Sequence, residues 1–77
     1  MPTLQRFGAT SIRMYADDHH PPYFHIAGAD FQVLVRIVDL IIIAGAARKA
    51  QIAEAMAWAE HNRELLALKW VELNERE

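Results

Sequence analysis

The sequence predicts an α+β fold, in which a three- to four-stranded antiparallel β-meander is followed by a C-terminal helical hairpin packed on one sheet face. Two observations indicate this fold. Before Gly45, β-branched and aromatic residues alternate with polar ones, and turn-forming residues interrupt the pattern. After Gly45, neither Gly nor Pro occurs for thirty-two residues, and helix-forming residues such as Ala, Leu, Glu and Lys predominate. The short connections between strands favour antiparallel neighbours.

Four segments of the first half are predicted to be strands. Residues 11–16 alternate with a period of two, which is typical of a half-buried strand. Pro21 and Pro22 place a loop after this segment, because proline has no N–H to donate to a ladder. Residues 23–27 and 31–37 are the next strands, and residues 40–43 are a short fourth strand. The side chains predicted to face the helices are Ile12, Met14, Phe24, Ile26, Phe31, Val33 and Val35.

The second half predicts two helices. The first covers about residues 46–60, and the second covers residues 63–74 with Asn62 as its N-cap. Each has one main apolar stripe, and Trp58, Leu68 and Val71 lie outside these stripes. One sheet face covers only one stripe of each helix, so the surplus apolar surface predicts an interface with another chain. The alternative is that Trp58 and Leu68 pack against each other within the hairpin.

Length and composition limit the possible classes of protein. The 77 residues are enough for one domain, and a core of this size is marginal, which favours self-association or a protein partner. The chain has no cysteine, which excludes disulfides and thiolate metal sites. A formal net charge of −2 gives no general attraction to nucleic acids or acidic membranes. The longest apolar run, residues 40–44, is too short to span a bilayer, and the first residues lack a secretion signal, so we expect a cytoplasmic protein.

Residues 15–25 carry the strongest functional signal. They contain two Asp, three His, two Pro and three aromatic residues in eleven positions. A turn requires Pro or Asp but not three imidazoles, so we expect a functional surface here. Alternation places side chains suited to nucleic acid or to a partner protein on the sheet face away from the helices, namely Arg13, Tyr15, Tyr23, His25 and Arg36. An ordinary solvated sheet face is the simpler alternative.

The same segment supports a catalytic hypothesis. His25 and His19 are candidates for the acid and base that cleave a phosphodiester without metal, and Asp18 is a candidate for orienting a histidine. Arg13 would stabilise the charge of the transition state, and Tyr23 is a further candidate for proton transfer.

A metal site is a weaker hypothesis. Asp18, His19, His20 and His25 offer suitable ligands, and His61 is a further one. Their spacing matches no strong metal-binding motif, and adjacent histidines point apart on an extended backbone. The three glycines are too far apart for a phosphate-binding loop. We therefore expect neither a metal nor another cofactor.

Several segments of the chain resemble a known protein family. They are Met1-Pro2-Thr3 with Arg6-Phe7-Gly8, then Ile12-Arg13-Met14-Tyr15, then Asp17-Asp18-His19-His20-Pro21-Pro22-Tyr23-Phe24-His25, and later Trp58, His61-Asn62-Arg63-Glu64-Leu65 and Trp70. Over nearly its whole length the chain resembles the bacterial family called domain of unknown function 4160. The family pattern usually has His at the position of Tyr23 and Pro at the position of Ala47. A function that needs an imidazole at position 23 would be lost or altered in this chain, because Tyr23 stands there.

The resemblance implies a short, standalone and mostly prokaryotic protein with no established activity. Such proteins are often encoded beside another small protein, an arrangement like that of toxin–antitoxin pairs. With the surplus apolar surface, this favours a protein-interaction module, as a homo-oligomer or heterocomplex, in which Trp58, Leu68 and Val71 form contacts. The alternatives are a small metal-independent ribonuclease-like toxin and a non-catalytic nucleic-acid-binding regulator.

Overall fold

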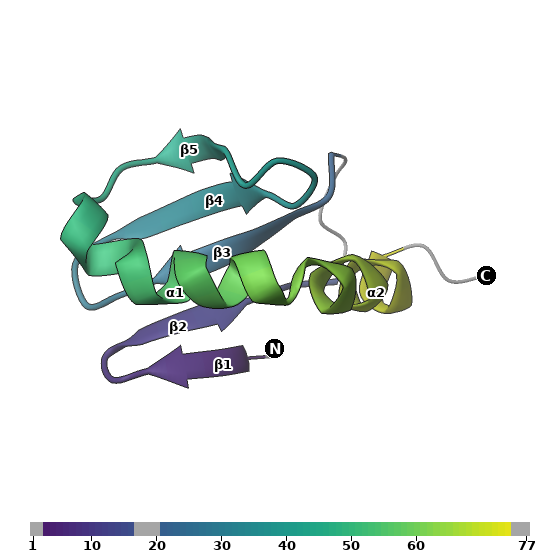
Figure 1. Cartoon of the computed structure of the whole chain (residues 1–77), viewed down its shortest axis with the longest axis horizontal. Coiled ribbons are helices and arrows are strands. Elements are labelled where there is room, and N and C mark those ends of the chain that lie inside the picture. Colours follow the sequence, from purple (N-terminus) through teal and green to yellow (C-terminus); the bar gives the residue numbers. More distant parts are fainter. Residues whose placement is uncertain (1–2, 17–20, 75–77) are drawn as a thin grey trace.

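The computed structural model describes residues 3–16 and 21–74 of the chain. Five strands are followed by two helices (Figure 1). The strands are β1 (Thr3–Phe7), β2 (Thr10–Arg13), β3 (Tyr23–Ala27), β4 (Gln32–Arg36) and β5 (Ile42–Gly45), and the helices are α1 (Lys49–His61) and α2 (Arg63–Asn74). The predicted α+β fold is confirmed, although the sheet has five strands rather than three or four.

The sheet is a meander of order β1-β2-β3-β4-β5 in which all neighbours are antiparallel. β1 is the strand that the sequence analysis did not predict. It pairs with β2 across a two-residue turn in which Gly8 has a φ of 63°. Glycine adopts this left-handed conformation without steric cost, so the turn closes tightly and sets Phe7 opposite Thr10. The register shifts farther along the pair, between Thr3 and Gln5.

One hydrophobic core joins the sheet to both helices. Helix α1 contributes Ile52, Ala55 and Ala59, and α2 contributes Leu66 and Trp70. The buried side chains from the sheet half of the chain are Ile12, Met14, Phe24, Ile26, Val33, Val35 and Ile37. These include every side chain predicted to face the helices except Phe31, which is half-buried beside the core. Burial of this cluster is the main stabilising contribution to the fold.

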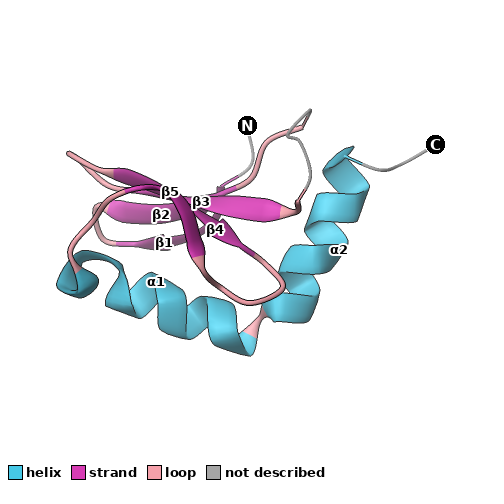
Figure 2. Ribbon diagram, turned by 90° about the horizontal axis from the view of Figure 1, so that it is seen from above, coloured by secondary structure: helices cyan, strands magenta, loops and turns pink. Residues whose placement is uncertain are grey.

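The two helices meet at Asn62 and diverge from each other. Figure 2 shows α1 running along the sheet and α2 leaving the junction at a large angle to it. The carbonyl of Asn62 accepts a hydrogen bond from the amide of Leu66, as expected for an N-cap residue of α2. Its side-chain amide, however, donates to the carbonyl of Trp58, 2.8 Å away. Asn62 therefore fixes the end of α1 with its side chain and starts α2 with its backbone.

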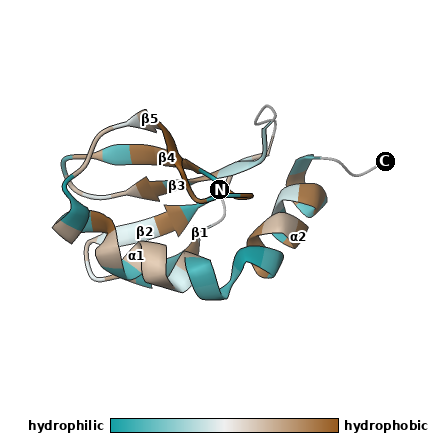
Figure 3. Cartoon of the chain, turned by 45° about the horizontal axis from the view of Figure 1, so that its top comes forward, coloured by the Kyte–Doolittle hydropathy of each residue, from teal (hydrophilic) through white to brown (hydrophobic). Residues whose placement is uncertain are grey.

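β5 forms one edge of the sheet and is not covered by a helix. All four of its residues are exposed, whereas α1 lies against β2 on the other half of the sheet. Figure 3 shows that the segment leading into β5 is strongly hydrophobic. Neither helix of the described ranges has the length and apolar character needed to cross a membrane.

Candidate functional site

The sheet face away from the core places His25 in the middle of a row of side chains. In the strand register, His25 of β3 lies opposite Arg13 of β2 on one side and opposite Leu34 of β4 on the other. Directly opposed residues on antiparallel strands share a face and lie within contact distance. The alternation read from the sequence therefore agrees with the structure in placing Arg13 and His25 side by side.

His25 is nearly buried although it lies outside the hydrophobic core. Only 8% of its surface is exposed. The side-chain amide of Gln32 donates a hydrogen bond to its Nδ1 atom at 2.7 Å. The ring of Tyr15 stands edge-on to the imidazole, with centroids 4.5 Å apart and an interplanar angle of 84°. The ring of Tyr23 lies 5.4 Å from it at 55°. Two phenol rings and one amide thus enclose the imidazole.

Tyr23 connects this cluster to the second helix. Its ring lies between His25 and the buried Trp70 of α2, with centroids 5.6 Å apart for the second pair. Asn74, at the end of α2, donates from its side-chain amide to the backbone carbonyl of Tyr15 at 3.2 Å. Both tyrosines that enclose His25 are therefore held by α2, a link that periodicity within single elements does not reveal.

The two arginines predicted on this face have different partners. Arg13 donates from Nε to the hydroxyl of Ser11 at 3.0 Å, beside His25. Arg36 makes a fork-like contact with the carboxylate of Asp39, with Nη2 to Oδ2 at 2.7 Å and Nε to Oδ1 at 3.0 Å. These hydrogen bonds lower the pKa of Asp39 below its ordinary value. Arg36 is thus already bound to an acid, whereas the partner of Arg13 is neutral.

Two of the predicted catalytic residues, Asp18 and His19, lie outside the described residues, and so does His20. Of the described residues, no three His, Asp or Glu side chains gather where they could hold a metal ion. His61 bonds through Nδ1 to the carbonyl of Ala57 at 2.9 Å, within its own helix. The described candidates that the structure brings together are Arg13, Tyr15, Tyr23 and His25.

A second candidate surface lies on the outer side of α2. Leu68 and Val71 are 63% and 46% exposed and line a shallow hollow of about 420 Å³ with Glu64 and Ala67. A neighbouring hollow of about 330 Å³ shares Glu64 and Ala67 with it. That second hollow is also lined by Pro21, Pro22, Arg36, Ile37, Val38 and Arg63. We call the joint surface formed by Pro21, Pro22, Val38, Ala67, Leu68 and Val71 the α2–proline surface.

Trp58 has a different environment from Leu68 and Val71. Its ring is half-buried and packs edge-on against Phe7 of β1, with centroids 6.4 Å apart at 70°. Trp58 is thus occupied within the chain, by a strand that the sequence analysis missed. Leu68 remains 63% exposed, whereas the half-buried Trp58 packs on Phe7 beside the core.

The family described as Domain of unknown function (DUF4160) matches residues 10–71. The chain belongs to this family. Neither a curated protein nor a solved structure matches it. In this DUF4160 protein the matched segment runs from the start of β2 to Val71 in α2. It therefore contains Arg13, Tyr15, Tyr23 and His25, which we call the His25 cluster, and also the α2–proline surface, whereas β1 lies outside it.

Proposed function

We propose that this DUF4160 protein is a protein-interaction module and one component of a two-protein pair of toxin–antitoxin type. The observation that carries the proposal is the exposure of Leu68 and Val71 on the α2–proline surface. These residues are three positions apart and share one side of α2. The opposite side of α2 carries Leu66 and Trp70, which are buried in the core. Folding therefore does not require burial of Leu68 and Val71. Contiguous apolar surface of this kind is typical of a binding site for another protein.

The shape of this surface also supports a protein partner. Pro21 and Pro22 form a wall with fixed φ angles, which loses little conformational entropy when a partner binds. Arg63 donates from Nη1 to the carbonyl of Val38 at 3.0 Å, which ties the β4–β5 turn to the start of α2. Glu64 lines both hollows, and Arg36 and Arg63 line the second one, so charged groups stand beside the apolar residues. Such charges select a partner that carries complementary charges.

Co-purification with the product of the neighbouring gene tests this proposal. We expect the two proteins to form a complex of defined mass in light scattering. Leu68→Glu should weaken that complex by about tenfold or more, because it puts a charge at the centre of an apolar contact. Leu65→Glu is the matched control, since Leu65 lies on the same helix, is exposed, and lines neither hollow. Retention of the complex in Leu68→Glu, or its equal loss in both variants, would contradict the proposal.

A second candidate is a metal-independent ribonuclease-like toxin that uses the His25 cluster. The proximity of four side chains favours it: the imidazole of His25, the phenols of Tyr15 and Tyr23, and the guanidinium of Arg13. Groups of these types can transfer protons and stabilise the charge of a phosphate. Because His25 is nearly buried, a substrate would meet the phenols and Arg13 first. Cleavage of a labelled RNA in the presence of a metal chelator tests this candidate. Cleavage that is lost in Arg13→Gln and in His25→Gln, with the fold intact, would support it over the first proposal.

A further inference from the structure

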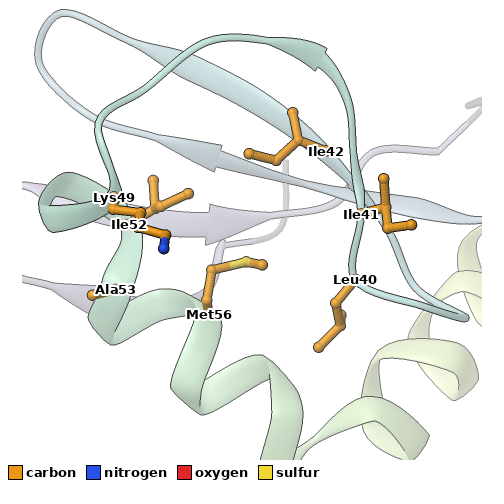
Figure 4. A pocket seen from close by; sticks show the side chains of 7 residues that line it. All are labelled: Leu40, Ile41, Ile42, Lys49, Ile52, Ala53 and Met56. Atoms are coloured by element: carbon orange, nitrogen blue, oxygen red, sulfur yellow. The ribbon is translucent and has the colours of Figure 1, made fainter.

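An apolar groove lies between β5 and α1, on the side of the sheet that carries the core. Its volume is about 650 Å³. Figure 4 shows Leu40 and Ile42 from the β5 side and Ile52 and Met56 from α1 around an open space. Ile41, Ala53 and Lys49 complete the lining. The groove exists because α1 packs against β2 and leaves the β5 end of the sheet uncovered.

The outer edge of β5 is open as well. β5 is the last strand in the sheet, so within the described part of the chain no further strand pairs with it. Ile41 is 51% exposed and Ile43 is 37% exposed. Proteins usually protect such an edge with charged residues, proline or a β-bulge. Residues 40–47 contain no charged residue and no proline, although the pairing of β5 with β4 shifts register at Ile43. Three consecutive isoleucines therefore lie at an uncharged edge.

We propose that the protein forms a homodimer in which β5 pairs antiparallel with β5 of a second copy. An antiparallel edge is complementary to itself, because a two-fold axis lets each strand satisfy the hydrogen-bonding groups of the other. The surface is separate from the α2–proline surface, so the dimer goes beyond the proposed function and does not depend on it.

The absence of charge on β5 favours a second copy over a foreign partner. In a two-fold strand pair, any charged residue near the axis would lie opposite its own copy and repel it. Interfaces that select a foreign partner generally rely on complementary charges and on repulsion of wrong partners. An uncharged edge offers no such selection, whereas branched side chains such as that of Ile43 pair well with themselves across strands.

The size of the interface requires that the groove takes part. The chain has 4944 Å² of accessible surface, and a stable interface buries about 800 Å² on each partner, roughly a sixth of that area. Pairing of a four-residue strand is too small alone. A two-fold axis perpendicular to the sheet places both α1 helices on the same side, so the two grooves adjoin under the joined strands. Dimerisation would then bury both apolar linings together.

The charges at the two ends of the groove are consistent with this arrangement. A register centred on Ile43 sets Ile41 of one copy opposite Gly45 of the other. It brings the turn containing Asp39 of one copy towards the start of α1 of the other, where Arg48 and Lys49 lie. Asp39 is ionised at neutral pH, as an ordinary aspartate is, and it is also paired with Arg36 of its own chain at 2.7 Å. Charged residues of opposite sign therefore flank the uncharged strand pair.

Light scattering of the purified chain, without any second protein, tests the dimer. We expect a mass twice that of the 8.8 kDa chain. Ile43→Glu should weaken dimerisation by about 100-fold, because like charges then meet near the axis. An equimolar mixture of Ile43→Glu and Ile43→Lys should restore a dimer of mixed composition. Leu68→Glu, on the α2–proline surface, should leave the dimer unchanged, which separates this proposal from the proposed function.

Cross-linking provides a second test that does not disturb the strand. The chain has no cysteine, so Ile43→Cys introduces a single thiol. Opposed residues of an antiparallel pair have Cβ atoms about 4.5–5.5 Å apart, close to disulfide distance. Mild oxidation should link Ile43→Cys into covalent dimers and leave the control Val71→Cys mostly unlinked. A monomer at all concentrations, a dimer that persists in Ile43→Glu, or equal cross-linking of both cysteine variants would each overturn the proposal.

Discussion

The side-chain hydrogen bond between Gln32 and His25 couples the orientation of the amide to the tautomer of the imidazole. The side-chain amide nitrogen of Gln32 lies 2.7 Å from Nδ1 of His25, and an amide nitrogen can only donate. With the amide nitrogen facing the ring, Nδ1 accepts and a neutral imidazole carries its proton on Nε2; with the amide rotated, its oxygen would accept from a protonated Nδ1. The assignment matters because a histidine that acts as acid or base works through a defined nitrogen.

We expect ¹⁵N NMR to show that, in the neutral form of the imidazole, Nδ1 is the unprotonated nitrogen. Gln32→Leu removes the donor and should lower the free energy of unfolding by about 1 kcal/mol. Gln5→Leu, at an exposed position on β1, is the control and should have a smaller effect. A protonated Nδ1 would show instead that the Gln32 amide is rotated, with its oxygen accepting.

Phe7 attaches β1 to α1 through its contact with Trp58. The two rings pack edge-on, with centroids 6.4 Å apart, and both are half-buried. Phe7→Ala should lower the free energy of unfolding by about 1–3 kcal/mol, since it removes an aromatic pair and the apolar contacts of Phe7 with the edge of the core.

Tryptophan fluorescence gives an independent measurement of this contact. Trp58 should become more exposed to water in Phe7→Ala, so its emission should shift to longer wavelength. The fully buried Trp70 should report no change, which can be checked with Phe7→Ala in a Trp58→Phe background. A shift that persists without Trp58 would contradict this assignment.

The sequence predicted correctly the strands and helices whose own residues show a clear alternation or a clear helical pattern. β3 and α2 begin and end where the alternation and the helix pattern predicted, and the inward-facing residues of β2, β3 and β4 fill the core. β1 was missed because residues 3–7 have no clear alternation. β1 pairs with its neighbour β2, and its Phe7 also contacts Trp58, more than fifty residues away in the chain.

The candidate site shows the same division between local pattern and tertiary contact. Alternation places His25 and Arg13 on one face, and the strand register agrees. The burial of His25 follows from Tyr15 and Tyr23, which α2 holds in place, and no single segment encodes that contact. The exposure of Leu68 follows from the helix pattern, whereas its continuity with Pro21 across the junction with α2 requires the fold.

Gly45 allows β5 to approach β4 closely. Its φ is 83°, and a Cβ atom at this position would collide with the backbone oxygen of Gln32. Gly45→Ala should therefore lower the free energy of unfolding by about 1–3 kcal/mol, through backbone strain and displacement of the strand. Gly8→Ala is the matched control, because Gly8 also has a positive φ but has open space around it. Equal losses in the two variants, measured by urea unfolding, would show that the collision with Gln32 contributes nothing.

The ion pair between Arg36 and Asp39 predicts a pH dependence of stability in the acid range. Hydrogen bonds from Arg36 lower the pKa of Asp39 below its ordinary value of 3.8. In the unfolded chain the pKa returns to that value, so the ionised carboxylate favours the folded state. The contribution is complete above the unfolded pKa and is lost as pH falls through the lower, folded pKa. Because both side chains are about one-third exposed, we expect the effect to be small and to weaken in salt.

NMR titration of the Asp39 carboxylate measures this directly. We expect its midpoint below 3.8 in the wild type and close to that value in Arg36→Gln, because the charged donor is removed. Arg13→Gln is the control, since the guanidinium of Arg13 donates to the Ser11 hydroxyl and should not change the titration of Asp39. Asp39→Asn should also flatten the dependence of unfolding on pH as the pH falls below the ordinary Asp value of 3.8. An unshifted midpoint in the wild type would mean that the contact at 2.7 Å is not kept in solution, and the turn before β5 would then lack this constraint.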